Sequence, residues 1–184
     1  MEDLERYAAD AAGGDALAAA ALVRATQSDV WRLCAALVDR SSADDLTQET
    51  YLRAFGSLHR FEGRSTLRTW LLSIARRVCA DALRSRRRRR LTLVSDDAVR
   101  TALEGPAAGT ADRVGEGVVV GDLLSRLAPE RREAFVLTQL LGLPYAEAAE
   151  VAGCPVGTIR SRVARAREDL VTAVTDAGDD ASAL

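Results

Sequence analysis

The sequence predicts an all-α protein in which two helical modules are joined by a flexible linker. Apolar residues recur at helical spacing through residues 15–90 and 122–174, and no segment alternates with period two for long enough to form a strand. Glycines interrupt every long period between residues 91 and 121. The 184 residues are 48% hydrophobic but only 4% aromatic, an Ala/Leu/Val composition that packs helices closely.

The first predicted helix runs from about Asp15 to Val38. Its apolar residues fall at i, i+3, i+4 and i+7 and form one stripe: Val30, Leu33, Cys34 and Leu37. A second helix is expected after Ser41-Ser42, because serine is a favourable N-cap and acidic residues follow near the positive end of the helix dipole. Its predicted buried stripe is Tyr51, Ala54, Phe55 and Leu58.

The third predicted helix begins after Ser65 and has the most regular pattern in the chain. Its apolar stripe covers four turns: Leu67, Trp70, Leu71, Ile74, Val78 and Ala82. Arginines occupy its other faces: Arg68, Arg76, Arg77 and Arg84. The helix then enters five consecutive arginines that repel one another unless an anion lies beside them: Arg86, Arg87, Arg88, Arg89 and Arg90.

The first module is therefore assigned to residues 1–90, an acidic glycine-containing linker to 91–121, the second module to 122–175 and an acidic tail to 176–184. In the second module Pro129 suits the first turn of a helix that continues through Leu141, with Gly142 as its C-cap. Three elements follow: a short helix over Tyr145–Ala152, a tight turn at Gly153–Pro155 and a helix from Val156 to about Val174.

All 25 positively charged residues are arginines, and this excludes whole classes of chemistry. A P-loop or a Schiff-base enzyme needs a lysine, and one histidine with three widely spaced cysteines argues against a Cys/His zinc site or a histidine-based triad. We therefore expect no catalytic residues, no metal and no cofactor. GC-rich coding explains the missing lysine. The acidic start and the lack of an apolar run of about 20 residues predict a cytoplasmic protein without a membrane segment.

The net charge of −2 hides a strong segregation of charge along the chain. Residues 46–90 contain 12 arginines against 3 acidic residues, whereas residues 1–45 and 91–130 are acidic. A block of this kind predicts binding to a polyanion. A solvated arginine-rich helix end is the alternative.

Residues 145–170 have the outline of a helix-turn-helix. Ala149 is small where the helices would cross, Gly153 suits a turn with positive φ, and Ile159 would fill the space between the helices. The second helix of such a unit enters the major groove, and its expected base-edge residues are Gly157, Thr158, Arg160 and Ser161. Phosphates would lie against the arginines that follow: Arg162, Arg165 and Arg167. Four arginines in eight residues favour DNA binding over plain packing.

Several motifs resemble the extracytoplasmic-function (ECF) sigma factors of the sigma-70 family, here from a GC-rich bacterium. Residues 143–149 (LPYAEAA) and 153–167 (GCPVGTIRSRVARAR) resemble region 4. Residues 44–51 (DDLTQETY) look like the core-polymerase motif of region 2, and residues 61–77 together with Asp81 look like its promoter-melting motif. The family commonly has asparagine at the position of Arg77, and a guanidinium offers only donors, so the usual minus-ten base preference is in question.

The resemblance implies an alternative sigma factor that is not an enzyme. It would bind core RNA polymerase, read the minus-thirty-five duplex and melt the minus-ten element. The implied contacts with the β′ clamp helices are Asp45, Leu46, Gln48, Glu49 and Leu52. The implied minus-ten contacts are a pocket loop of Phe61, Glu62, Gly63, Arg64 and Ser65, followed by Arg68, Arg76, Arg77 and Arg84. The arginines at 86–90 would contact upstream phosphates, and Gly157, Thr158, Arg160, Ser161, Arg162 and Arg165 the minus-thirty-five duplex.

The polymerase β flap and an anti-sigma factor are further implied partners, and no small-molecule substrate is expected. Without partners, the two modules are able to pack together and hide the Asp45–Glu49 face or the recognition helix. From the residues alone, Asp45 to Glu49 also suit a solubilising helix face, Trp70 suits the core, and His59 suits a hydrogen bond within its loop. A conventional helix-turn-helix regulator acting without polymerase, or a protein-only partner such as an anti-sigma adaptor, remains open.

Overall fold

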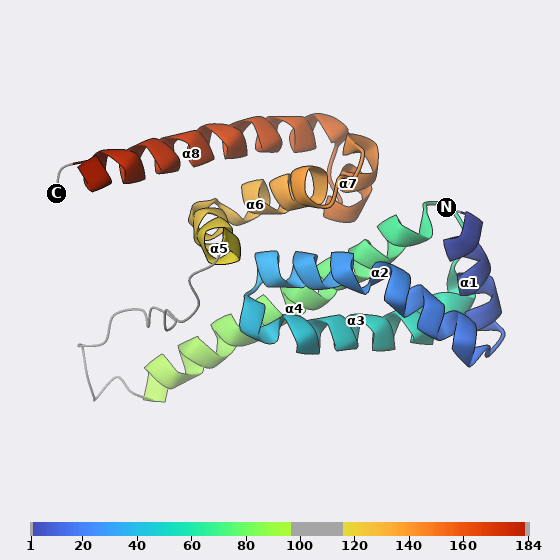
Figure 1. Ribbon diagram of the computed structural model, residues 1–184. Coiled ribbons are helices and arrows are strands. Elements are labelled where there is room, and N and C mark those ends of the chain that lie inside the picture. Colours follow the sequence, from blue (N-terminus) through green and yellow to red (C-terminus); the bar gives the residue numbers. More distant parts are fainter. Residues whose placement is uncertain (1, 97–115, 183–184) are drawn as a thin grey trace.

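The chain folds entirely into helices over the residues described by the computed structural model, which are 2–96 and 116–182 (Figure 1). Side chains are described for residues 3–89 and 121–175. The predicted all-α class is therefore confirmed. Helices extend into both ends of the predicted linker, because α4 (Leu67–Asp96) ends within it and α5 (Glu116–Arg126) begins within it. The middle of the linker, residues 97–115, lies outside the described part of the chain.

The first module consists of four helices and two short 3-10 turns: α1 (Glu2–Ala12), α2 (Ala16–Leu37), η1 (Arg40–Ser42), α3 (Ala43–Ser57), η2 (Leu58–Arg60) and α4 (Leu67–Asp96). The first predicted helix is confirmed almost to the residue. Its N-cap is Asp15, whose carboxylate accepts hydrogen bonds from the backbone N–H groups of Leu17 (2.7 Å) and Ala18 (3.2 Å).

The start of α3 differs from the expected serine cap. Ser42 stands at the N-cap position, but its side chain makes no capping hydrogen bond. Asp39 instead accepts from the backbone N–H of Ser42 (2.8 Å) and caps η1, because it lies three residues earlier with a stronger acceptor. The Ser42 hydroxyl is left to accept a hydrogen bond from the Arg86 guanidinium (2.5 Å).

Helix α1 was not predicted. It covers a small apolar cluster of buried Ala8, Leu22, Leu58 and Leu67. Its own apolar residues, Leu4, Tyr7, Ala8 and Ala11, follow helical spacing and face this cluster, so the signal was present in the sequence.

The second module contains α5 (Glu116–Arg126), α6 (Pro129–Phe135), a π-helical turn η3 (Val136–Leu140), α7 (Tyr145–Ala152) and α8 (Val156–Ser182). Pro129 opens α6 as predicted. The predicted single helix through Leu141 widens into the π turn, where the N–H of Leu141 donates to the carbonyl of Val136 (2.9 Å). Gly142 then has φ +67, the left-handed conformation that lets the chain turn. The backbone of α8 continues through most of the predicted tail.

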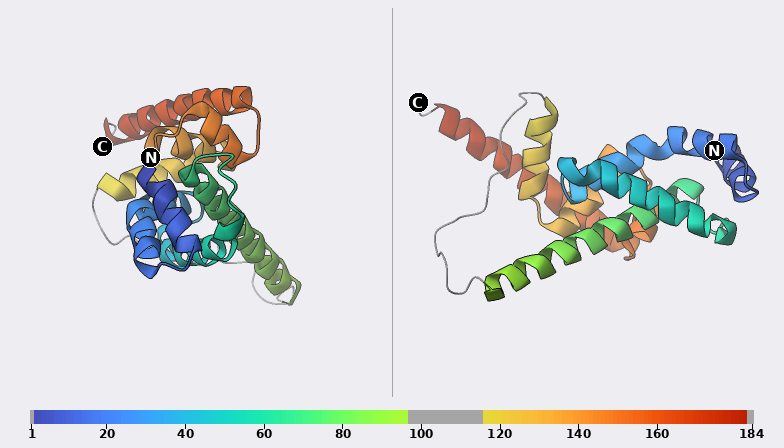
Figure 2. Two further views of the ribbon diagram at one scale, coloured as in Figure 1. Left: turned by 90° about the vertical axis from the view of Figure 1, so that its right-hand side faces the viewer. Right: turned by 90° about the horizontal axis from the view of Figure 1, so that it is seen from below.

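The two modules pack against each other around one apolar core. Buried residues of α2 and α4, among them Leu33 and Val78, belong to the same cluster as Leu137 and Ile159 of the second module. Figures 1 and 2 show α6, α7 and α8 lying over α2 and the N-terminal part of α4, while the C-terminal end of α4 projects away from the body. We call the contact surface of α2 and α4 with α6 and α7 the seam.

Candidate promoter and polymerase surfaces

The recognition segment at the start of α8 is held by a tight turn and a buried anchor. Gly153 has φ +65 and ends α7, and Ile159 is 0% exposed. Gly157, Arg160, Ser161 and Arg165 are exposed, and Thr158 and Arg162 are half-buried. Neither Arg160 nor Arg165 has an ion pair or hydrogen bond from its side chain among the described residues, so both guanidiniums are available to DNA.

Two other arginines of α8 are already engaged. Arg167 donates to the side-chain oxygen of Gln139 (2.7 Å), and Arg162 lies 3.7 Å from the sulfur of Cys154. Cys154 thus fills the turn beside a predicted phosphate-contact residue, in line with a packing role.

The outer face of α3 presents four of the five predicted polymerase-binding residues. Asp45 and Gln48 are exposed, Leu52 is 65% exposed, and Glu49 is half-buried. Leu46 differs, because it is half-buried and packs against the core. An exposed leucine beside carboxylates is a surface that a partly basic, partly apolar partner would cover.

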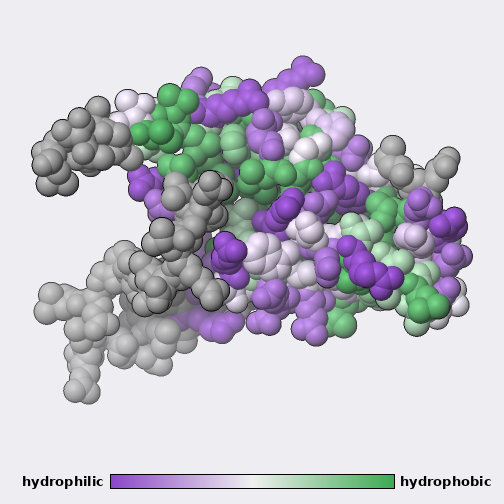
Figure 3. Space-filling model, in the orientation of Figure 1, coloured by the Kyte–Doolittle hydropathy of each residue, from purple (hydrophilic) through white to green (hydrophobic). Residues whose placement is uncertain are grey.

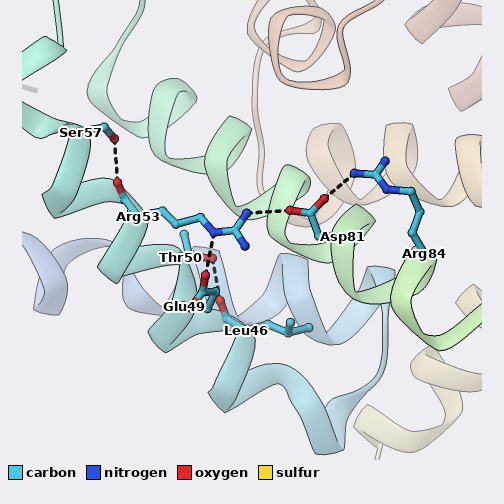
Figure 4. Close-up of polar contacts among 7 residues, drawn as sticks. All are labelled: Leu46, Glu49, Thr50, Arg53, Ser57, Asp81 and Arg84. Atoms are coloured by element: carbon cyan, nitrogen blue, oxygen red, sulfur yellow. Dashed lines mark hydrogen bonds and ion pairs between the residues drawn. The ribbon is translucent and has the colours of Figure 1, made fainter. Parts of the chain in front are cut away.

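A chain of charged groups links this face of α3 to α4 (Figure 4). The Glu49 carboxylate accepts from Arg53 (2.7 Å), Arg53 also donates to Asp81 (2.7 Å), and Asp81 accepts from Arg84. Hydrogen bonds from Arg53 and Arg84 lower the pKa of Asp81, and those to Asp81 and Glu49 raise the pKa of Arg53. Arg53 was missed in the sequence, although its i, i+4 spacing from Glu49 could have identified it.

The predicted minus-ten loop splits into an exposed tip and an inward aromatic residue. Glu62, Gly63 and Arg64 are exposed, and Ser65 is half-buried. Phe61 is half-buried and packs against Trp70, with ring centroids 5.3 Å apart. Phe61 therefore supports the loop from within, and Trp70 occupies the predicted apolar stripe.

At the tip, Glu62 and Arg64 form an exposed ion pair (3.0 Å), and Gly63 has φ +68, which favours glycine there. His59 accepts a hydrogen bond from Arg60 (3.2 Å), which fits its expected role within the loop. The tip is thus the part of the loop that is open to a base.

Two of the four predicted minus-ten arginines on α4 are tied to the second module at the seam. Arg68 donates to the carbonyl of Leu141 (2.6 Å) as well as to Asp29 (2.8 Å). Arg76 is paired with Glu133 of α6. Arg77 is exposed and has no side-chain partner among the described residues.

Carboxylates of the second module make most of the polar seam contacts. The Glu133 side chain is only 10% exposed. Glu147 of α7 accepts from the hydroxyls of Thr69 (2.5 Å) and Thr66 (3.2 Å) at the start of α4. Neither glutamate was identified from the sequence, because the pairing partners lie 57 to 81 residues away.

The arginine run begins on a fixed residue and continues into solvent. Arg86 is bound to Asp39 and Ser42 at the entrance to α3. Hydrogen bonds from Ser41, Arg86 and Ser42 outweigh the effect of burial and hold the pKa of Asp39 well below its usual range. Arg87, Arg88 and Arg89 are exposed, and the side chain of Arg90 lies outside the described residues.

The described residues offer no group of three or more His, Cys, Asp or Glu side chains that could hold a metal ion. In the same part of the chain, no helix is long and apolar enough to cross a membrane. Two exposed apolar residues lie on α8 beyond the recognition segment: Val171 is 67% exposed and Val174 is 56% exposed. Figure 3 shows hydrophobic surface at this end of α8.

Comparisons with known proteins identify the family to which the chain belongs. Residues 22–89 match the Sigma-70 region 2 family and residues 118–170 match the Sigma-70 region 4 family. The chain is 51% identical over 171 residues to the ECF RNA polymerase sigma factor SigC of Mycobacterium tuberculosis. This match covers 92% of this chain and 90% of that protein. The chain is 33% identical over 163 residues to the ECF RNA polymerase sigma-E factor of Haemophilus influenzae, covering 84% and 86%.

Solved structures show the same likeness. CnrH in complex with the cytosolic domain of CnrY is 28% identical, with a TM-score of 0.71 and coverage of 95% of this chain and 98% of that one. The sigma factor RpoE from Bartonella quintana, in complex with the anti-sigma factor NepR, is also 28% identical, with a TM-score of 0.63 and coverage of 83% and 94%. The sequence-based alternatives of a conventional regulator or a protein-only adaptor are thereby set aside. The chain belongs to the ECF sigma factors, non-enzymatic initiation factors that direct promoter recognition by RNA polymerase.

Proposed function

We propose that this sigma factor divides its work among three separate surfaces. The exposed face of α3 binds the β′ clamp helices of core polymerase, the loop tip and α4 hold the minus-ten element, and the start of α8 reads the minus-thirty-five duplex. The first two surfaces belong to one functional unit, residues 1–90, and the third belongs to a second unit, residues 122–175. The arginines of residues 86–89 follow upstream phosphates. The observation that carries this assignment is the exposure of the α3 face and the recognition segment, both unobstructed by the packing of the two modules.

The polymerase-binding residues have a matched test in two exposed leucines. Leu52 lies on the α3 face and is 65% exposed, whereas Leu17, at the start of α2, is 81% exposed. Neither side chain contributes to the core, so truncation of either leaves the fold intact. We expect Leu52→Ala to weaken binding to purified core polymerase about tenfold, the size of a moderate interface contact, and Leu17→Ala to have no effect. Equal affinities for the two variants would refute the α3 interface.

At the seam, Arg68 and Arg76 are bound to groups of the second module. DNA phosphates can bind these arginines only if they replace those groups, so promoter melting requires the seam to separate. The Leu141 carbonyl and the Glu133 carboxylate currently occupy positions that a phosphate oxygen would take. The carboxylate pairs with its arginine as a phosphate would. We infer that engagement of core polymerase, which places regions 2 and 4 on separate promoter elements, exposes this part of α4.

Further partners follow from the family. Region 4 is proposed to meet the β flap, with the polymerase and promoter in the cytoplasm. Because solved relatives form complexes with CnrY and with the anti-sigma factor NepR, we propose that an anti-sigma protein also binds this chain. Copurification of a small protein that blocks core binding would support this partner, and copurification that leaves core binding unchanged would count against it.

A further inference from the structure

Two of the three cysteines lie in contact in the core of region 2. Cys34 on α2 and Cys79 on α4 are 0% and 1% exposed, and their sulfurs are 3.6 Å apart. The third cysteine, Cys154, lies in the helix-turn-helix turn. All three are free thiols.

A cavity of about 310 Å³ at the seam reaches one of the two sulfur-bearing residues. Its region 2 wall includes Cys79, Leu37 and Leu83, and its region 4 wall includes Arg132 and Glu133. The space is large enough for a molecule of the size of a peroxide, since a water molecule needs only about 30 Å³ of liquid volume. Cys79 therefore lies at the wall of this cavity, whereas Cys34, which contacts the Cys79 sulfur, is not among the lining residues.

The contact also prepares one sulfur for reaction. The Cys79 thiol donates a hydrogen bond to the Cys34 sulfur, and this lowers the pKa of Cys34. A thiolate is the reactive form of cysteine. The same contact and burial raise the pKa of Cys79, so the proton is held on Cys79.

We propose that Cys34 and Cys79 form an oxidation site, at which a peroxide converts the two thiols into an internal disulfide. One sulfur attacks the peroxide, the O–O bond breaks, and a sulfenic acid and one water form. The second sulfur displaces hydroxide from the sulfenic acid, which leaves as a second water when it takes up the remaining thiol proton. The two thiols thus lose two electrons and two protons, and one peroxide is reduced to two waters.

The bond would enclose a functionally dense segment. Residues 34–79 contain all of α3 and the whole loop between η2 and α4. Closing the sulfur separation to about 2 Å needs a movement of about 1.5 Å, which a side-chain rotation and a small approach of α2 and α4 can supply. A cross-link over such a loop restricts the unfolded chain, so the oxidised protein resists unfolding of region 2.

The test uses the full chain with Cys154→Ser, which leaves only the paired thiols. After treatment with hydrogen peroxide under native conditions, we expect the intact mass to fall by two hydrogens. We also expect the thermal midpoint to rise by roughly 5–15 °C, with both changes reversed by dithiothreitol. Cys34→Ser and Cys79→Ser in the same background are the matched controls and should show neither change.

Three results would overturn the proposal. The first is a gain of oxygen without loss of two hydrogens, and the second is a disulfide with no rise in the thermal midpoint. The third is a protein that forms the disulfide in urea but stays reduced when folded, since the unfolded chain shows that the oxidant and the mass measurement work. None of these outcomes depends on polymerase binding, so the proposal is tested independently of the proposed function.

Discussion

The ion pair between Arg76 and Glu133 offers the sharpest perturbation of the seam. Glu133→Gln keeps the shape of the side chain but removes its charge. Loss of one partner from a fully buried pair costs about 3–5 kcal/mol. Here the Glu133 side chain is 10% exposed but Arg76 is 35% exposed, so water can still solvate the guanidinium. We therefore expect the free energy that holds the seam closed to fall by about 1–2 kcal/mol. This corresponds to about a five- to thirtyfold shift of the equilibrium from the closed seam toward the open one.

The assay is the affinity of the free chain for a fluorescent single-stranded minus-ten oligonucleotide. Opening the seam frees Arg76 and exposes the neighbouring part of α4, so Glu133→Gln should bind the oligonucleotide about tenfold more tightly while its free energy of unfolding falls. Glu130→Gln is the matched control, because Glu130 lies one turn earlier on α6, is exposed and has no side-chain partner among the described residues. A variant that loses stability but binds the oligonucleotide no more tightly than the control would show that the seam does not compete with DNA.

Three further predictions concern the α3 face, region 4 and the α2–α3 junction. Glu49→Arg reverses a charge on the proposed clamp-binding face and should abolish capture of core polymerase in a pull-down, while minus-thirty-five duplex binding is unchanged; capture at the wild-type level would contradict the interface. Ile159→Ala removes a side chain that is 0% exposed and should cost about 2–5 kcal/mol in urea unfolding of the chain, whereas a loss below about 1 kcal/mol would mean that the helix-turn-helix is not anchored there. The lowered pKa of Asp39 means that its ionised form stabilises the fold at neutral pH and that this contribution is lost as pH falls below about 4. Asp39→Asn should therefore lower the thermal midpoint at pH 7 but not in strong acid, and an equal deficit at both pH values would refute the role of the charge.

Local features were predictable from the sequence because their causes are local. Asp15 caps α2 through hydrogen bonds to residues two and three positions away, and Gly153 and Ile159 define the helix-turn-helix within fifteen residues. Periodicity alone shows which face of a helix is buried, but it does not show against what. The cap expected at Ser42 was wrong for a reason that is also local. The carboxylate of Asp39, three residues earlier, takes the backbone N–H of Ser42 and caps η1 instead.

The seam could not be predicted from these patterns. Thr69 and Glu147 meet across 78 residues, and an arginine on a helix face has the same pattern whether it binds a phosphate or a distant glutamate. Likewise, the pattern that placed Phe61 in a DNA-binding loop gave no information on its packing against Trp70. The fold of the recognition segment was predictable because the turn at Gly153 and the buried Ile159 both lie within α7 and α8 and the turn between them.

The central claim, that this chain directs initiation by RNA polymerase, is tested most directly by run-off transcription. Purified core polymerase with the wild-type protein should produce a discrete transcript from promoter fragments drawn from the source genome, and core polymerase alone should produce none. The Glu49→Arg protein should fail in the same reaction. Absence of any discrete transcript with the wild-type protein across such a promoter library, or an equal transcript from core polymerase alone, would contradict the claim.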